Sequence, residues 1–207
     1  IHSKSYESLE ETWEVVRRGL GRINTLVQDM LDYSRARVID RRRVDINSLL
    51  LELSATFADD FAKRGIDCKL ALDEALQPMM LDADGLEKSL VNLLVNAAEA
   101  MPEDRGRIDL RTRLNDEGNT VIEVEDNGSG IPKEVMARIF IPFFTTKGSK
   151  GSGLGLAMSK KFIEDMGGRI EVESRPRIGS RCQITLHISA PAPRLGEAPE
   201  LETQFEI

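Results

Sequence analysis

The chain has 207 residues, of which 41% are hydrophobic and 30% charged, a composition typical of a globular protein with one large domain or one domain plus an accessory element. Its formal net charge of −7 argues against nucleic-acid binding, which needs a basic face. No apolar run approaches the ~20 residues of a membrane span, so we expect no membrane contact by this segment and a cytoplasmic location, whether the parent protein is soluble or membrane-tethered.

Residues 1–40 are predicted to form a long helix and a linker. Apolar residues recur there at alternating steps of four and three, the heptad spacing of a helix that packs along a partner helix. These residues are Leu9, Trp13, Val16, Leu20, Ile23, Val27 and Met30. Packing of this helix on its own domain remains the alternative to a bundle or coiled coil. The basic run at 41–43 is interpreted as a solvated linker after the helix, not as a nucleic-acid patch.

The second region, residues 41–190, begins with another helix. Asp45 or Asn47 can cap this helix, which runs to about Lys63 and is stopped by Gly65. Strands are predicted at 66–72, 79–81, 108–114, 121–126, 169–174 and 180–188. Because helices and mostly antiparallel strands are interspersed without regular βαβ spacing, we predict an α+β fold, a two-layer sandwich and not a doubly wound parallel sheet.

Three smaller features complete the pass along the chain. A short helix is predicted after Pro132, and a glycine-rich segment opens a further helix over about 154–166. Cys68 and Cys182 lack metal-type spacing and fall in alternating stretches, so we expect buried free thiols, which fit a reducing cytosol. Residues 191–207 are rich in Pro, Ala and Glu and are interpreted as a flexible tail.

Asn92 and Asn96 lie one turn apart on a predicted helix that Asp84 is expected to cap and that ends before Pro102. Its apolar face comprises Leu86, Leu90, Leu93, Leu94, Ala97 and Met101. Two amides in register can ligate a hydrated Mg²⁺ through their oxygens. Taken alone, they can equally be exposed or capping asparagines.

Asp126 ends an apolar strand and is followed by Gly128 and Gly130. A carboxylate at a strand end can accept a hydrogen bond from an exocyclic amine, and glycines beside it let a flat base approach the backbone. An ordinary Asn-Gly turn is the alternative for this segment.

Gly151, Gly153 and Gly155 stand at alternate positions directly before a helix. Successive N–H groups and the helix N-terminus make such a loop a phosphate cradle. A dinucleotide-binding loop would need an apolar strand just before it, whereas the preceding residues here are Phe-Phe-Thr-Thr-Lys. The GxxxxGK[ST] pattern is also absent, so a P-loop kinase is excluded.

The order of these motifs resembles the ATP-binding domain of the gyrase, heat-shock chaperone, histidine-kinase and MutL superfamily, and within it sensor histidine kinases most closely. The N-box is found at 92–97, the G1 box at 126–130, the F-box at 140–144 and the G2 box at 151–155. The resemblance spans roughly residues 44–188 and implies a two-layer α/β sandwich that binds ATP and Mg²⁺.

The resemblance also implies residue roles. Asn96 would bind Mg²⁺, with Asn92 supporting it near the phosphates, and Lys147 of a short lid could reach a phosphate or remain merely solvated. Asp126 would take the adenine amino group in a pocket bordered by Gly128, Gly130 and Ser180. The phosphates would be bordered by Gly151, Gly153, Leu154 and Gly155.

The function implied is that of a two-component sensor histidine kinase. It would transfer the ATP γ-phosphoryl group to a histidine and thence to an aspartate of a response-regulator receiver domain. Residues 1–40 resemble the second helix of the dimerisation hairpin, which implies a homodimer. We expect the acceptor histidine upstream of residue 1, because His2 lacks the surroundings of an acceptor box.

Other functions remain open. An ATP-hydrolysing clamp of the same superfamily would carry a water-activating glutamate where this chain has Asn92. A non-catalytic nucleotide-binding or dimerisation module is a further alternative. A serine kinase of the anti-sigma type is disfavoured by the heptad helix.

Overall fold

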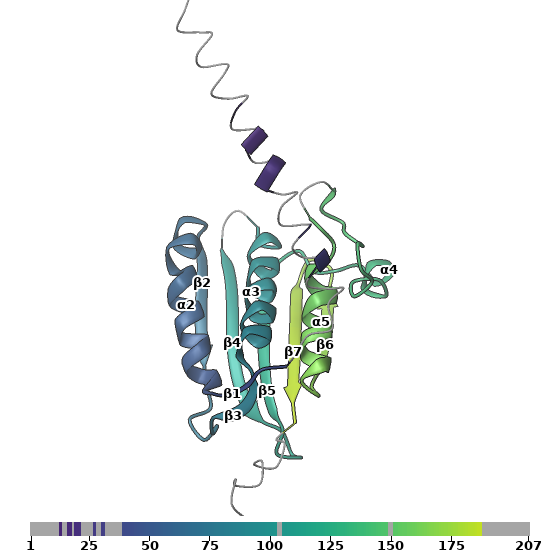
Figure 1. The fold of residues 1–207 in the computed structure, drawn as a ribbon. Coiled ribbons are helices and arrows are strands. Elements are labelled where there is room, and N and C mark those ends of the chain that lie inside the picture. Colours follow the sequence, from purple (N-terminus) through teal and green to yellow (C-terminus); the bar gives the residue numbers. More distant parts are fainter. Residues whose placement is uncertain are drawn as a thin grey trace, which may run out of the picture.

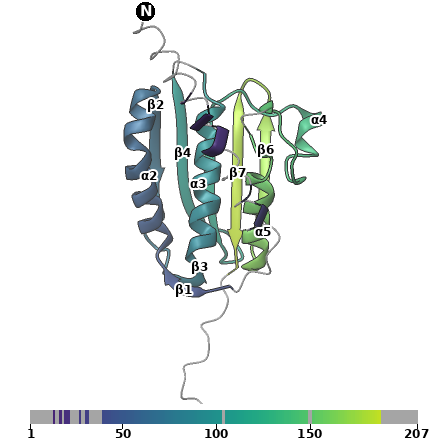
Figure 2. The ribbon, with the colours of Figure 1, turned by 45° about the horizontal axis from the view of Figure 1, so that its top comes forward.

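The computed structural model describes residues 39–187, except 103–104 and 149–150, together with residues 13, 16, 17, 19–21, 27, 30 and 31. A five-stranded sheet carries helices on one face, and a two-stranded sheet lies at one end of it (Figure 1 and Figure 2). The covering helices are α2 (Ile46–Lys63), α3 (Ala83–Glu99) and α5 (Gly155–Asp165). The predicted two-layer α+β sandwich is confirmed.

The large sheet is mixed, with the order β2-β4-β5-β7-β6. Its strands are β2 (Ile66–Ala71), β4 (Gly106–Leu114), β5 (Thr120–Asp126), β6 (Arg169–Arg175) and β7 (Gly179–Leu186). Strand β2 runs parallel to β4, and the other neighbours are antiparallel. The short helix α4 (Lys133–Met136) follows Pro132, as predicted.

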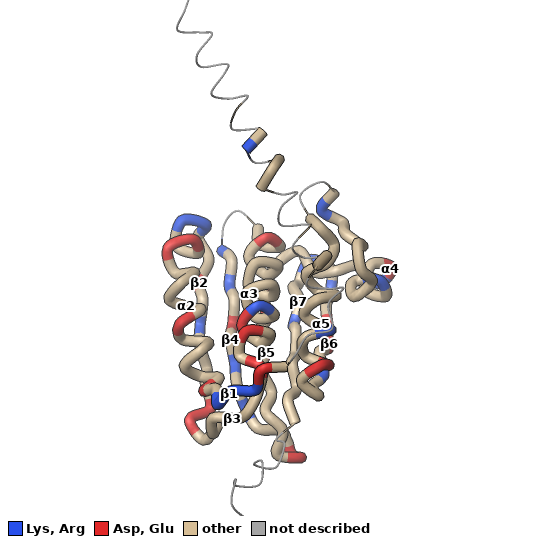
Figure 3. Tube along the Cα trace, in the orientation of Figure 1, with Lys and Arg blue, Asp and Glu red and all other residues tan. Residues whose placement is uncertain are grey.

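The core fills the space between the helices and the sheet. The apolar face predicted for α3 is buried at Leu86, Leu90, Leu93, Leu94 and Ala97. They pack with inward-facing strand residues such as Ile108, Ile122 and Ile184, each fully buried. Met101, which was predicted to end this helix, lies two residues beyond its end and is half-buried. The opposite face of the sheet carries cross-strand ion pairs, among them Arg113 with Glu123 at 3.2 Å, and residues of both charge signs occur along β4 (Figure 3).

The interpretation of residues 41–43 as a linker was wrong. Residues Arg41–Val44 form strand β1, which pairs antiparallel with β3 (Met79–Asp82). The arginine side chains are exposed, as expected of a solvated segment, and Arg42 pairs with Asp84 at 2.8 Å. Hydrogen bonds to β3 satisfy the backbone N–H and C=O groups of residues 41–44. The charge of the arginines could not indicate this strand, because its partner is distant in the sequence.

The cap of α3 also differs from the prediction. Asp82 and not Asp84 is the N-cap, and its Oδ1 accepts a hydrogen bond from the N–H of Gly85 at 3.1 Å. Strand β3 extends through Asp82, so the helix begins at Ala83 and Asp84 falls in its first turn. The other predicted cap is confirmed, because Asp45 accepts from Ser48 at the start of α2.

The described positions of the N-terminal segment are helical, and their apolar side chains are exposed. They include Trp13, Val16, Leu20, Val27 and Met30, whereas Leu9, Ile23 and residues 191–207 lie outside the described residues. In the described part of the chain, no helix combines the length and apolarity needed to span a lipid bilayer.

We expect Asp82→Ala to lower the free energy of unfolding by about 1–2 kcal/mol, because it removes a helix N-cap. Asp84→Ala is the matched control. It removes an exposed ion pair with Arg42 and a favourable charge in the first helical turn, which each contribute at most about 1 kcal/mol at such an exposed position, so its loss should be smaller. Urea denaturation followed by circular dichroism measures both, and an equal or larger loss in the control would contradict the assignment of the cap.

Candidate functional site

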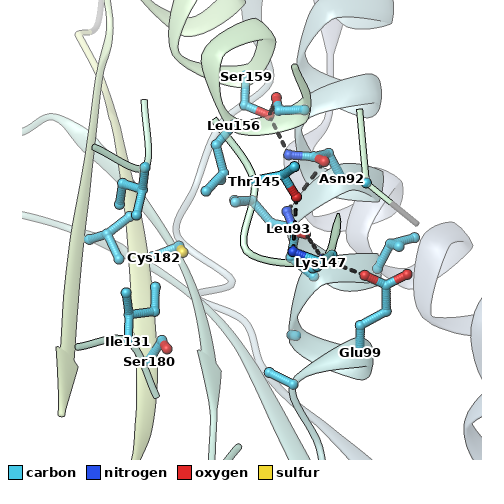
Figure 4. A pocket seen from close by; sticks show the side chains of 18 of the residues that line it. Asn92, Leu93, Glu99, Ile131, Thr145, Lys147, Leu156, Ser159, Ser180 and Cys182 are labelled. Carbon is cyan, nitrogen blue, oxygen red and sulfur yellow. Dashed lines mark hydrogen bonds and ion pairs between the residues drawn. The ribbon is translucent and has the colours of Figure 1, made fainter. Parts of the chain in front are cut away.

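A cavity of about 1120 Å³ opens between α3, α5, the end of β5 and the loops that connect them. This volume slightly exceeds the ~300–1,000 Å³ usual for small-molecule sites. The predicted residues that line it are Asn92, Asn96, Asp126, Gly130, Lys147, Gly151, Gly153, Gly155 and Ser180. Figure 4 shows Ser180 and Cys182 at one end, across the cavity from Asn92 and Lys147.

Asp126 stands at the buried end of the cavity. It ends β5 and pairs in register with Ser180 of β7. Its Oδ1 accepts hydrogen bonds from the N–H groups of Gly128 at 2.8 Å and Ser180 at 3.2 Å. Burial raises the pKa of Asp126 above its ordinary value, an effect that these two hydrogen bonds oppose. Because both bonds go to one oxygen, the other can accept a hydrogen bond from a ligand.

Gly128 and Gly130 are needed by the packing of the loop after Asp126. A Cβ at Gly128 would lie 2.5 Å from the carbonyl oxygen of Ala100, and one at Gly130 would lie 2.1 Å from that of Arg175. Gly130 also has a φ of +65°, which favours glycine. The loop is therefore held between the end of α3 and the β6–β7 turn. Gly128 is not among the cavity-lining residues and acts through its N–H on Asp126.

Ser174 of β6 is a site residue that the sequence did not reveal. Its hydroxyl accepts from the N–H of Ile131 at 2.7 Å, donates to the carbonyl of Gly179 at 2.9 Å, and lies 2.9 Å from the hydroxyl of Ser180. It thus ties the loop after Asp126 to the strand that carries Ser180. The sequence offered one indication of this role, which is that Ser174 is a polar residue at a position of β6 where the alternation of the strand predicts an inward-facing side chain.

Asn92 joins α3 to α5 at the other end of the cavity. Its Nδ2 donates to the hydroxyl of Ser159 at 3.0 Å, and its Oδ1 accepts from Nδ2 of Asn96 at 3.3 Å. A Cβ at Gly155 would lie 2.2 Å from that Oδ1, so the third glycine permits the close approach of the two helices. Ser159 is almost completely buried and was missed from sequence, although it lies one turn after Gly155.

Asn96 presents its oxygen to a cationic group. Its Oδ1 accepts from Nζ of Lys147 at 2.7 Å, and Lys147 also pairs with Glu99. The lid folds onto the glycine loop, because Thr145 Oγ1 accepts from the N–H of Lys147 at 3.1 Å and faces Gly151. Within the described residues, no cluster of three or more His, Cys, Asp or Glu is suited to a metal. A magnesium ion here would therefore take the Asn96 oxygen together with phosphate and water oxygens.

The N-terminus of α5 is available to an anion. Leu154 occupies the N-cap position, where its side chain makes no capping hydrogen bond, and its own N–H donates to the Ser152 hydroxyl at 3.3 Å. Its side chain is fully buried with Met158 and Phe162 and does not line the cavity, so its part in any site is that of its backbone. Uncapped N–H groups at a helix N-terminus attract phosphate oxygens.

Both cysteines are free thiols, as predicted, and both are half-buried. Cys182 lines the cavity two residues after Ser180 on β7 (Figure 4). Burial raises the pKa of Cys182 to about 12, and burial likewise raises that of Cys68. Both are therefore neutral thiols at physiological pH, since a thiolate would need a far lower pKa.

Comparisons with known proteins agree with this geometry. Residues 81–190 match the family described as histidine kinase-, DNA gyrase B- and HSP90-like ATPase. The chain is 35% identical to the signal transduction histidine-protein kinase AtoS of Escherichia coli (strain K12) over 180 residues, which cover 87% of this chain and 29% of AtoS. The chain spans 21% to 42% of the length of the curated relatives it matches.

Two solved structures are similar in fold. Full-length ShkA in complex with AMPPNP has a TM-score of 0.74 and 26% identity, over 88% of this chain and 40% of that one. The histidine kinase ThkA in complex with the response regulator protein TrrA has a TM-score of 0.71 and 30% identity, over 84% of this chain and 50% of that one.

The contact between Gly155 and Asn92 predicts a stability effect. Gly155→Ala should lower the free energy of unfolding by about 1–3 kcal/mol, because the added methyl group overlaps the Asn92 amide. In an Asn92→Ala background the same substitution should cost much less, because the obstructing group is gone. Urea denaturation of the four proteins tests this coupling, and equal costs in both backgrounds would contradict it.

The raised pKa of Asp126 predicts a pH dependence. The folded protein holds this proton at higher pH than the unfolded chain, so the stability gained is complete below the unfolded pKa of about 3.9 and is lost as pH rises through the folded pKa. Asp126→Asn removes that loss. The unfolding free energy of the variant relative to the wild type should therefore increase from about pH 4 upward. A constant difference across the pH series would contradict the shift.

Proposed function

Because the chain belongs to the histidine kinase-, DNA gyrase B- and HSP90-like ATPase family, we propose that it is the ATP-binding catalytic region of a two-component sensor histidine kinase, which transfers the γ-phosphoryl group of ATP to a histidine. The observation that carries this proposal is the cavity itself. One end offers a half-buried carboxylate and the other a helix N-terminus beside two asparagines. The adenine amino group needs an acceptor such as the carboxylate, and the triphosphate needs the N–H groups of the helix and a cation ligand.

The base binds at the Asp126 end in this proposal. The amino group of adenine donates to the carboxylate oxygen that the backbone leaves available, while Gly130 and Ser180 border the ring. Gly151, Gly153, Gly155 and the backbone at Leu154 border the phosphates at the start of α5. The bound AMPPNP of ShkA, a structure with the same fold, supports a nucleotide in this cavity.

The phosphates are positioned from α3 and the lid. Phosphoryl transfer depends on positioning and on neutralisation of charge, and Mg²⁺ bound to the Asn96 oxygen would supply most of that charge. Asn92 accepts from the Asn96 amide nitrogen and so turns the Asn96 oxygen toward the cavity. Lys147 stands within reach as a second positive group. The attacking imidazole is itself the nucleophile, so this region needs no base.

The remainder of the chain serves phosphotransfer in the same proposal. In it, residues 1–40 comprise the second helix of a dimerisation hairpin and a linker, residues 41–190 are the ATP-binding catalytic domain, residues 191–207 are a flexible tail, and the acceptor histidine lies upstream. The exposed side chains of Trp13, Val16, Leu20, Val27 and Met30 support a homodimer, because such a stripe is stable only against a partner. A receiver domain takes the phosphoryl group next, which the ThkA–TrrA complex supports.

A hydrolytic clamp is less well supported by the site. The hydrolysing members of the superfamily that this chain resembles carry a glutamate one turn before the magnesium asparagine, where it activates water as a general base. Asn92 occupies that position and is held by Ser159 of α5. Glu99 lies one turn after Asn96 in the sequence and is paired with Lys147. The pocket therefore fits transfer to an external nucleophile better than hydrolysis.

Calorimetry tests the nucleotide site. This chain should bind ATP in the presence of Mg²⁺ with a dissociation constant of about 1 mM or tighter, the usual range for substrates. Asp126→Asn should weaken binding about tenfold or more, because it replaces an acceptor by an amide donor facing the adenine amine. Glu125→Gln is the matched control, since this neighbouring carboxylate pairs with Arg111 on the opposite face of the sheet. Unchanged affinity in Asp126→Asn would remove Asp126 from the site.

Labelling with γ-³²P-ATP tests the transfer step. The full-length protein should gain acid-labile phosphate on a histidine upstream of this chain, and Asn96→Ala should abolish it. Acid-labile label on His2 of this chain alone would contradict the position proposed for the acceptor.

A further inference from the structure

Glu99 reaches the candidate site through the lid. The Nζ of Lys147 donates to Asn96 Oδ1 at 2.7 Å and pairs with the carboxylate of Glu99, so the lid is tied to α3 by residues about fifty positions away in the chain (Figure 4). Glu99 lies three residues after Asn96 on α3, which places both side chains on one side of the helix. We call these three residues the lid latch.

The latch competes with magnesium for one oxygen. In the proposed function, Asn96 Oδ1 is the protein ligand of Mg²⁺, and the same oxygen accepts from Lys147 here. An ammonium 2.7 Å from the oxygen and a divalent ion at the ~2.0–2.1 Å of a magnesium bond would place two cations about 4 Å apart on one neutral acceptor. Their repulsion opposes simultaneous occupancy, so binding of Mg²⁺ weakens the hold on Lys147.

Glu99 decides how firmly Lys147 is held. Of the two side chains that the Lys147 ammonium contacts, Asn96 is neutral and Glu99 is charged, so Glu99 supplies most of the attraction that keeps the lysine in place. We propose that Glu99 is a positioning residue that acts through Lys147, holding the lid on Asn96 in the nucleotide-free protein until Mg²⁺·ATP displaces it. This inference rests on the proposed function of the site.

The two partners of the latch therefore have opposite effects on nucleotide affinity. Loss of Glu99 frees the lysine in advance, so less free energy is spent on opening the lid. Loss of Lys147 removes a group that can reach a phosphate. The side chains of Lys147 and Glu99 are 39% and 43% exposed, so their ion pair is partly screened by solvent. Its effect on binding is therefore about two- to fivefold.

Limited proteolysis without nucleotide tests the latch directly. Trypsin must take the free Lys147 ammonium into its own pocket, so pairing with Glu99 protects the bond after Lys147. Glu99→Gln should raise the rate of this cleavage about two- to fivefold, as read by mass spectrometry. Glu87→Gln, the same change on an exposed residue of the same helix, is the control and should leave the rate unchanged. Equal rates in Glu99→Gln and wild type would overturn the latch.

A calorimetric double-mutant cycle with Mg²⁺·ATP separates the latch from simple repulsion. Glu99→Gln should tighten binding about two- to fivefold, and Lys147→Met should weaken it. In the Lys147→Met background, Glu99→Gln should have no further effect, because Glu99 acts only through the lysine. Tightening that persists in that background would mean that Glu99 repels the phosphates directly, which overturns the proposal, as would weaker binding of Glu99→Gln.

The two experiments distinguish the latch from the proposed function. If the wild type bound no Mg²⁺·ATP, the nucleotide site would fail, but the proteolysis comparison contains no nucleotide and still decides whether Glu99 holds Lys147.

Discussion

The contact on which the rest of the site depends is the one between α3 and α5 through Asn92. Its amide spans the two helices, donating to Ser159 and facing Gly155 without an intervening side chain. Because Asn92 also accepts a hydrogen bond from Asn96, that close approach brings the N-terminus of α5 and Asn96 to the same end of the cavity. A phosphate chain can then be held by a helix dipole on one side and a cation ligand on the other. A larger residue at position 155 would separate these two groups.

The opposite end of the cavity depends on strand register. Antiparallel pairing of β5 with β7 sets Asp126 against Ser180, and the N–H of Ser180 reaches the carboxylate. Burial disfavours the charge, while two backbone donors favour it. The free energy spent on burying this carboxylate makes its remaining oxygen selective, because a hydrogen bond formed away from water discriminates strongly between donors and non-donors. A donor such as the amino group of adenine meets this requirement.

Local patterns predicted most of the fold, and the order of motifs predicted most of the site. Periodicity located α2, α3, α5 and the strands to within about two residues, because apolar spacing reflects which face is buried. Strand β1, the Asp82 cap, Ser159 and Ser174 were missed. Each depends on a partner distant in sequence or on a boundary shifted by such a partner. Leu154 shows the same limit, since its neighbours in the motif line the cavity while its side chain enters the core.

Helix α3 carries three functional side chains on one side, spaced by four and then three residues. Asn92 fixes the distance to α5, Asn96 offers an oxygen to a cation, and Glu99 holds the cation of the lid. A rigid helix keeps these groups at fixed separations, so a ligand that takes the Asn96 oxygen must also disturb the lysine shared with Glu99. Occupancy of the cavity is in this way coupled to the position of residues 145–147. A lid attached only by its own backbone would lack that coupling, because nothing on α3 would distinguish the empty from the filled cavity.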